Sequence, residues 1–307
     1  MLNRIVNKLV GLNSVLHAYD YLDTNDGWVK EQSPVIRLSD IYFDPYVYKF
    51  NDKYHMYVSN RTRNAIELFM SEDGITWEEV STCINGTSSE TWDSIVNRAC
   101  VVQTEKGYLM FYTGQHNGTS KIGLATSADG LAFTRFASKP VIFPEFAHEK
   151  DSVMNPCVIW NSKKEMFQMW YSSGEFIEPD VICYAESKDG IDWKKWEQPV
   201  LTASVNKYDR AKVGGCDVHV MRNRYIMYYI GYQDVNIGRI CVASSDDGIH
   251  WKRDESNPII SPSKDSWDAH SVYKPSVIYE KDRIMLWYNG RKGYVEKIGL
   301  ARKTLKD

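Results

Sequence analysis

A repeat of 56 to 60 residues constrains the fold of this chain more than any other feature of the sequence. Four segments end in Ser-x-Asp-Gly-x-x-aromatic, with the acids at Asp73, Asp129, Asp189 and Asp247. Each repeat also contains short apolar runs, such as YHMYVS and YLMFYTG, which are typical of β-strands. An Asp-Gly pair favours a tight turn between consecutive antiparallel strands. The long period therefore predicts stacked units of four short strands each.

The two ends of the chain look like parts of one fifth repeat. The last copy ends at IGLARKTLKD and lacks a fourth strand, whereas NDGWVKEQSPVIRL, residues 25–38, matches the end of the fourth copy. The sequence therefore predicts an all-β, five-bladed β-propeller that spans residues 1–307 as one domain, with residues 25–38 as the closing strand of the last blade. Apolar residues at roughly helical spacing predict a short N-terminal helix over residues 1–18.

The composition argues against several classes of partner. The net charge is −3, from 37 basic and 40 acidic residues, so neither nucleic acid nor a membrane surface is expected as a partner. No apolar run approaches the ~20 residues of a membrane-spanning helix. The six cysteines form no Cys-x-x-Cys pair and several lie in strand-like runs, which favours buried, reduced thiols and a cytoplasmic location.

Residues that recur in every repeat are expected to serve the fold. An aromatic residue follows each turn, and it is expected to pack between blades: Trp77, Phe133, Trp193, Trp251 and, from the N-terminal segment, Trp28. An acid also precedes each first strand: Asp40, Asp93, Asp151, Asp209 and Asp268. Capping of the blade entrance accounts for these acids. Their location nevertheless makes Asp93 and Asp268 candidate substrate ligands and Asp151 a candidate catalytic residue.

One repeat position differs in every unit and is the predicted binding site. It stands near the start of the first strand and is occupied by Asp44, Arg98, Asn155, Gly215 and Lys274. First strands of a propeller begin on one face beside the central channel, so different residues here resemble a site grafted onto a regular fold. Proline follows Asp44, and it is expected to hold that residue in an extended conformation.

Loops on the same face supply further candidates. Arg61, Arg291 and His270 are expected to contact substrate, together with Arg98, Asn155 and Lys274. Cleavage of a glycosidic bond commonly requires two carboxyl groups, one ionised and one protonated. Asp44 is the predicted base. Glu175, in the third-unit loop SSGEFIEPD, is the preferred partner, with Glu178, Glu149 and Asp151 as the other candidates.

The repeats and the opening Asp-Pro of "FDPYVYKFNDKYHMYVS" resemble the clan of five-bladed glycosidases, glycoside hydrolase families 43, 32 and 68, and more distantly the family 130 phosphorylases. The resemblance covers roughly residues 26–303 and implies that Asp44 is the base. Family 43 carries an acid at the position of Arg98 and a glutamate at that of Asn155. This chain departs from the family at both positions, so the family's acid and modulating acid cannot be transferred to them.

Three functions follow from these observations. The first is a glycosidase-like enzyme acting on a glycan with an anionic group, since Arg61, Arg98, Lys274 and Arg291 suit a carboxylate or phosphate. The second is a phosphorylase, or an enzyme of phosphorylated or nucleotide-linked sugars. The third is a carbohydrate-binding propeller without catalysis. No cofactor is expected, although a channel metal ion such as calcium stays open.

Overall fold

The computed structural model describes residues 18–87, 90–205, 207–234 and 236–305. The predicted helix over residues 1–18 therefore lies, except for Ala18, outside the described residues. No helix in the described part is long and apolar enough to cross a membrane. One 3-10 helix, η1 (Ala147–Glu149), accompanies the strands. The strands are β1 (Trp28–Lys30), β2 (Tyr42–Phe50), β3 (Lys53–Asn60), β4 (Ala65–Ser71), β5 (Glu78–Asn85), β6 (Ile95–Thr104), β7 (Gly107–His116), β8 (Thr119–Ser127), β9 (Thr134–Arg135), β10 (Ser152–Asn161), β11 (Met166–Gly174), β12 (Pro179–Ser187), β13 (Lys194–Lys195), β14 (Lys212–Met221), β15 (Arg224–Asp234), β16 (Ile237–Ser245), β17 (Lys252–Arg253), β18 (Ser271–Tyr279), β19 (Arg283–Lys292) and β20 (Val295–Thr304).

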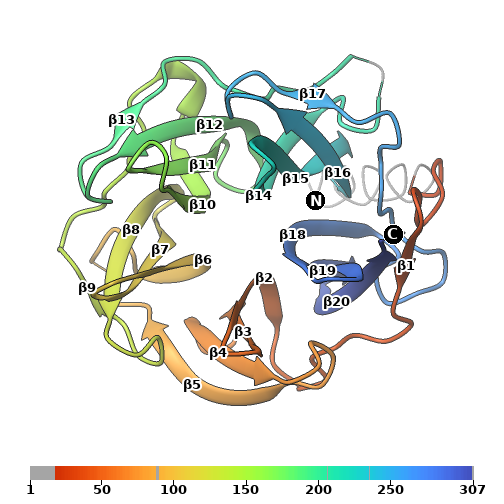
Figure 1. The fold of residues 1–307 in the computed structure, drawn as a ribbon, viewed down its shortest axis with the longest axis horizontal. Coiled ribbons are helices and arrows are strands. Elements are labelled where there is room, and N and C mark those ends of the chain that lie inside the picture. Colours follow the sequence, from red (N-terminus) through yellow and green to blue (C-terminus); the bar gives the residue numbers. More distant parts are fainter. Residues whose placement is uncertain (1–17, 88–89, 206, 235, 306–307) are drawn as a thin grey trace, which may run out of the picture.

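The strands form antiparallel units of four arranged around a common centre (Figure 1). We number them unit 1 (β2–β5), unit 2 (β6–β9), unit 3 (β10–β13), unit 4 (β14–β17) and unit 5 (β18–β20 with β1). Units 2 and 3 are connected by one parallel bridge between Ser120 and Ser152. The N-terminal β1 pairs with β20 through Trp28↔Lys303 and Lys30↔Ala301. The chain is thus all-β, as the repeat predicts.

The first strand of each unit lies nearest the centre, and hydrogen bonds join first strands of neighbouring units. Val277 N donates to Asp217 Oδ2 at 2.6 Å, and Val47 N donates to Ser276 Oγ at 2.8 Å. Cysteine thiols occupy the same repeat position in units 2 and 3, where Val158 N donates to Cys100 Sγ and Val218 N to Cys157 Sγ, each at 3.2 Å. The contact between Val47 and Ser276 joins unit 1 to unit 5.

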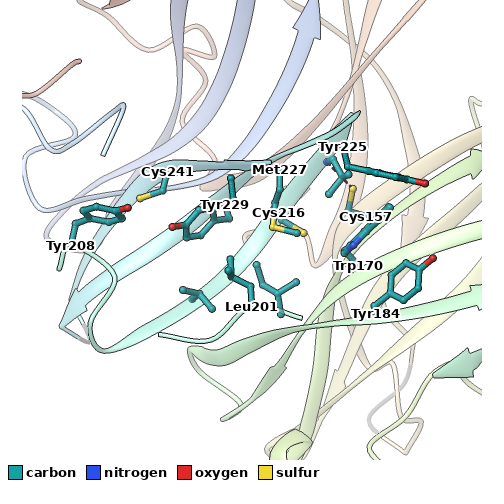
Figure 2. Packing of buried hydrophobic residues seen from close by; sticks show 14 residues of the cluster. Cys157, Trp170, Tyr184, Leu201, Tyr208, Cys216, Tyr225, Met227, Tyr229 and Cys241 are labelled. Atoms are coloured by element: carbon teal, nitrogen blue, oxygen red, sulfur yellow. Dashed lines mark hydrogen bonds between the residues drawn. The ribbon is translucent and has the colours of Figure 1, made fainter. Parts of the chain in front are cut away.

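Aromatic contacts between units follow the repeat. Each turn aromatic meets an aromatic ring of the preceding unit edge to face: Trp77–Trp287, Phe133–Tyr57, Trp193–Phe111, Trp251–Trp170 and Trp28–Tyr228. Such edge contacts add about 0.5–1.5 kcal/mol each to the burial of apolar area. The predicted packing role of these residues is confirmed. Figure 2 shows the apolar cluster between units 3 and 4, in which Trp170 and Cys157 meet Met227 and Cys216.

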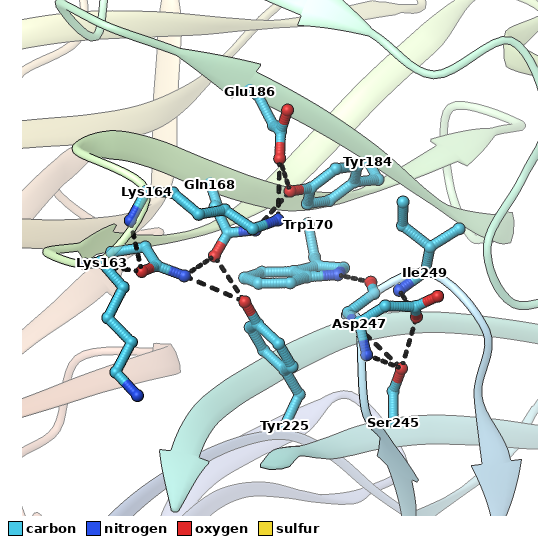
Figure 3. Close-up of polar contacts among 12 residues, drawn as sticks. Lys163, Lys164, Gln168, Trp170, Tyr184, Glu186, Tyr225, Ser245, Asp247 and Ile249 are labelled. Atoms are coloured by element: carbon cyan, nitrogen blue, oxygen red, sulfur yellow. Dashed lines mark hydrogen bonds and ion pairs between the residues drawn. The ribbon is translucent and has the colours of Figure 1, made fainter. Parts of the chain in front are cut away.

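The Asp-Gly segments form hydrogen-bonded turns that dock onto the neighbouring unit. In unit 4, Asp247 Oδ1 accepts hydrogen bonds from Ser245 Oγ and Ile249 N. Gly248 O accepts a hydrogen bond of 2.8 Å from the Trp170 indole of unit 3 (Figure 3). Gly248 has φ 84°, a left-handed conformation that glycine adopts without steric cost. The acids of these turns therefore serve local structure, as their recurrence predicts.

A buried acid, a tyrosine and a cation recur between the entrance and the outer strand of units 2 to 5. The carboxylate accepts from both partners in each case: Asp93 from Tyr112 and Arg135, Glu149 from Tyr171 and Lys195, Asp209 from Tyr229 and Arg253, and Asp268 from Tyr288 and Lys30. Lys30 belongs to β1, and the other three cations belong to β9, β13 and β17. Lys30 thus occupies in unit 5 the place that the outer strand fills elsewhere.

All six cysteines are buried and unpaired with one another. Burial raises the pKa of Cys183 to about 12, which keeps this thiol protonated. The expectation of reduced, buried thiols agrees with the structure.

Candidate functional site

The five predicted site positions share an unusual backbone conformation. The residues have positive φ values of 53° at Asp44, 56° at Arg98, 54° at Asn155, 34° at Gly215 and 50° at Lys274. Each lies at a register shift, a β-bulge, in its first strand. The expectation that proline keeps Asp44 extended is therefore wrong, because the bulge imposes the left-handed conformation. Non-glycine residues rarely adopt it, and strained residues often mark functional sites.

Hydroxyl groups of the preceding unit hold several of these strained residues. Arg98 N donates to Ser59 Oγ at 2.8 Å, and Asn155 N donates to Thr113 Oγ1 at 3.1 Å. Gly215 N donates to Ser172 Oγ at 2.7 Å. Hydrogen bonds between neighbouring units therefore hold the backbone of these three site residues in its left-handed conformation.

A cavity of about 200 Å³ opens at the inner ends of the units. Residues from all five units line it, including Asp44, Arg98, Asn155 and Ile230. Arg61 and Arg291 also line it. Its volume is small beside pockets for drug-sized ligands, so it suits about one sugar ring.

Asp44 and Arg98, which both line the cavity, form an ion pair. Arg98 Nε lies 2.9 Å from Asp44 Oδ2, and both side chains are largely buried. Arg98 also donates to Asn97 Oδ1 at 3.1 Å. The Asp44 carboxylate is thus oriented by a neighbouring unit at the point where it faces the cavity.

Glu178 brings a second carboxyl group to the cavity, from the connection between β11 and β12. Burial raises the pKa of Glu178, against the opposing effect of a hydrogen bond with Tyr232 and the charges of Arg98 and Arg291. Repulsion by Asp44 acts in the same direction as burial. Glu178 therefore favours the protonated form more than an ordinary glutamate.

Glu296 is the third carboxyl group, contributed by β20. Tyr273 donates a short hydrogen bond to it, and Arg61 Nη2 lies 2.9 Å from Glu296 Oε2. Burial raises the pKa of Glu296 as well. Oε1 of Glu296 therefore already has a hydrogen-bond partner, whereas Oε2 has only the ionic contact with Arg61.

Several predicted residues lie away from the cavity. Glu175 has a side chain 59% exposed and pairs with Lys212 at 2.7 Å, so Glu178 faces the cavity in its place. Asp151 is exposed. Lys274 is buried without lining the cavity, and its charge acts on Cys100 and Asp217 instead. His270 Nδ1 accepts a hydrogen bond from Gly293 N and does not line the cavity either.

Asp93 and Asp268 are engaged by the fold. Burial acts to raise the pKa of Asp93, but hydrogen bonds from Arg135 and Tyr112 outweigh it and lower that pKa. Asp268 is 2.7 Å from Lys30 Nζ. Neither lines the cavity, because each already accepts hydrogen bonds from the repeated cation and tyrosine, and their contact with substrate stays a prediction.

Sequence reasoning did not select Tyr232 or Tyr273 as site residues, and it counted Glu296 only among the polar residues of the loops on the same face. Tyr232 and Glu296 belong to the ends of β15 and β20 that border loops on the predicted face. That location is a signal, but an amphipathic tyrosine inside a strand looks the same whether it packs in the core or faces a cavity.

One group of potential metal ligands occurs among the described residues: His148, Glu149 and Cys183. The Glu149 carboxylate is occupied by Tyr171 and, at 2.6 Å, by Lys195. A neighbouring ammonium and a thiol whose pKa is raised to about 12 do not suit a cation. The group lies outside the cavity, and the expectation of a channel cation stays untested.

Comparison with known proteins places this geometry in context. Residues 71–208 match the glycosyl hydrolases family 32 N-terminal domain. A β-1,2-mannobiose phosphorylase of Thermoanaerobacter sp. (strain X514) is 32% identical over 136 residues, which cover 39% of this chain and 44% of the phosphorylase. The chain is related to the β-propeller glycosidases. An uncharacterised protein of Mycobacterium tuberculosis is 29% identical over 213 residues, which cover 64% of this chain and 68% of that protein.

Solved glycosidases share the fold. A glycoside hydrolase superimposes with a TM-score of 0.75 over 96% of both chains at 19% identity. A thermostable family-43 glycoside hydrolase gives a TM-score of 0.70 over 87% of this chain and 93% of that one, at 18% identity. At these identities the β-propeller glycosidases show a common architecture, and the chemistry has to be argued from the cavity itself.

Proposed function

We propose that this chain is a glycosidase-like enzyme that acts on a glycan with an anionic group, in a funnel at the centre of a five-bladed propeller. β1 closes the ring by supplying the fourth strand of unit 5. Its pairing with β20, the Trp28–Tyr228 contact and the Lys30–Asp268 pair support this closure. The other units contain contacts of the same kinds, namely the pairing of an outer strand, an aromatic contact with the preceding unit and a cation bound to a buried acid.

One observation carries the enzymatic proposal: Asp44 and a Glu178 of raised pKa line the same small cavity. Pairs of carboxyl groups in different environments divide the roles of base and acid in glycosidases. Asp44, paired with Arg98, activates the attacking oxygen. Glu178 protonates the leaving oxygen. Arg98 and Asn155 stand where family 43 carries acids, so the second acid comes from a loop in place of a first strand.

The proposed anionic group is recognised by arginine. Arg61, Arg98 and Arg291 line the cavity, and the first two pair with Glu296 and Asp44. Arg291 Nη2 donates to Asn236 O at 2.8 Å, whereas its Nε atom is buried without a hydrogen-bond partner among the described residues. A buried donor without a partner costs about 1–3 kcal/mol. A carboxylate or phosphate oxygen is the acceptor that suits it.

A phosphorylase is the second candidate. Its support is the likeness to relatives named β-1,2-mannobiose phosphorylase and 1,2-β-oligomannan phosphorylase. In that reaction inorganic phosphate replaces water as the attacking group, and Arg291 binds it. The non-catalytic sugar-binding alternative retains the same cavity without turnover.

Turnover of β-1,2-mannobiose and of neutral and uronic-acid aryl glycosides, with and without inorganic phosphate, tests these proposals. Hydrolysis of the uronides indicates the first function, and strict phosphate dependence indicates the second. Binding in calorimetry without turnover supports a binding protein. Arg291→Gln should abolish the preference for the charged ligand, and a preference that survives this substitution contradicts the proposed role of Arg291.

A further inference from the structure

The connection that carries Glu178 is held at both of its ends by ionic contacts. β11 ends at Gly174 and β12 begins at Pro179, so only residues 175–178 separate the two strands. Glu175, at the start of this connection, and Asp180, in β12, flank Glu178 in the sequence, and Glu178 lines the cavity. A Cβ atom at Gly174, where φ is 128°, would lie 2.4 Å from Asp180 Oδ2. Glycine therefore permits the close approach of the two flanks.

Lys212 joins these flanks from the neighbouring unit. Its Nζ atom lies 2.7 Å from Glu175 Oε2 and 2.9 Å from Asp180 Oδ1. The same ammonium donates to the backbone oxygen of Glu178 at 3.1 Å. An ammonium group has three donors, and here all three acceptors belong to one short segment. The backbone of Glu178 is thus fixed directly by Lys212.

The setting of Lys212 strengthens this contact. Its side chain is only 15% exposed, so solvent screens its ion pairs less than those of a surface lysine. Lys150 adds a second cation, 2.6 Å from Asp180, which balances the charge of the two acids. The residues at the position of Lys212 in the other units are uncharged: Ile41, Ile95, Ser152 and Ser271. The lysine is therefore particular to the unit that faces the Glu178 segment.

We propose that Lys212 is a positioning residue that holds Glu178 in place over the cavity. This inference rests on the proposed role of Glu178 as the acid. A carboxyl group that donates a proton must stand within hydrogen-bond reach of the leaving oxygen. The position of Glu178 depends on a four-residue connection, which no strand pairing restrains. Lys212 supplies that restraint from unit 4.

Lys212→Met retains the length of the side chain and removes its charge. Steady-state kinetics use whichever of the probes above the wild type turns over, β-1,2-mannobiose or the neutral and uronic-acid aryl glycosides, with and without inorganic phosphate. In Lys212→Met, kcat should fall about 100-fold, the scale of a misplaced catalytic group. KM should stay within about threefold, because the remaining cavity contacts persist. Lys212→Arg, which retains the charge, should recover part of kcat. Amide hydrogen exchange over residues 175–178 should become at least about tenfold faster in Lys212→Met.

Lys195→Met is the matched control. Lys195 is also a buried lysine with two acidic partners, but these are Glu145 at 3.0 Å and Glu149 at 2.6 Å. This variant should lose stability without faster exchange at residues 175–178. Unchanged exchange of that segment in Lys212→Met, or an unchanged kcat, overturns the proposal. A wild-type chain that turns over none of the probes contradicts the proposed function instead, and hydrogen exchange then decides on Lys212.

Discussion

Asp44 combines a left-handed backbone, an ion pair with Arg98 and a place on the cavity wall. Asp44→Asn is nearly isosteric, so the fold should persist while turnover falls by about 100-fold or more, the scale of a lost general base. Asp129→Asn is the control, because Asp129 accepts hydrogen bonds from Leu131 N and Ser127 Oγ within a turn. It should lower the melting temperature and spare the rate. Full activity of Asp44→Asn would rule out the mechanism.

The raised pKa of Glu178 also has a consequence for stability at the residue scale. A folded-state pKa above the unfolded value means that stability is greatest below the unfolded pKa, about 4.3, and declines as pH rises through the folded pKa. Glu178→Gln removes this decline. In urea titrations the variant should exceed the wild type in stability at pH 8, and the difference should shrink towards pH 4.

Glu175→Gln, a substitution in the same segment, should change the pH dependence of stability in the opposite direction. A hydrogen bond from Lys212 lowers the pKa of Glu175, so its contribution is present above the unfolded pKa and disappears as pH falls through the folded pKa. The Glu175→Gln variant should therefore be less stable than the wild type at pH 8, and this difference should shrink towards pH 4. Parallel pH curves for the Glu178→Gln and Glu175→Gln variants would contradict both assignments.

At the scale of the element, β1 is three residues long and depends on side chains for its attachment. Lys30→Met leaves the Asp268 carboxylate buried without its cation, which typically costs about 3–5 kcal/mol. Lys303→Met is the matched control, since Lys303 connects β20 to Asp26 by a more exposed ion pair. A surface pair contributes about 0–1 kcal/mol. Equal shifts of the urea midpoint in the two variants would show that the Lys30–Asp268 pair does not secure β1.

At the scale of the whole molecule, the ring is expected to depend on both ends of the chain. Removal of residues 1–33 deletes β1 and, with it, Trp28 and Lys30. Unit 5 then exposes the edge of β20 and the apolar surface around Tyr228, so cooperative unfolding should be lost. Removal of residues 1–13 should be milder. If the longer deletion melts like the full chain in calorimetry, β1 does not close the ring.

Internal repetition made much of this fold predictable from sequence. The turn aromatics and the Asp-Gly acids recur at fixed spacing, and the structure uses each of them in the same contact in successive units. The variable position was recognisable for the same reason. Asp44, Arg98 and Asn155 differ at one place in the repeat, and all three line the cavity.

Only the tertiary structure decided which of several similar candidate residues faces the cavity and which pairs with another part of the fold. Glu175 and Glu178 are three residues apart in one loop, and the contact of Glu175 with Lys212 of another unit leaves Glu178 to the cavity. The sequence left Asp93 as either a structural acid or a substrate ligand, and in the structure Arg135 of the outer strand and Tyr112 donate hydrogen bonds to it. Sequence therefore determined the period, the strands and the face of the site, because these follow from local pattern. The direction of each charged side chain depended on partners from distant segments, and only packing brings those together.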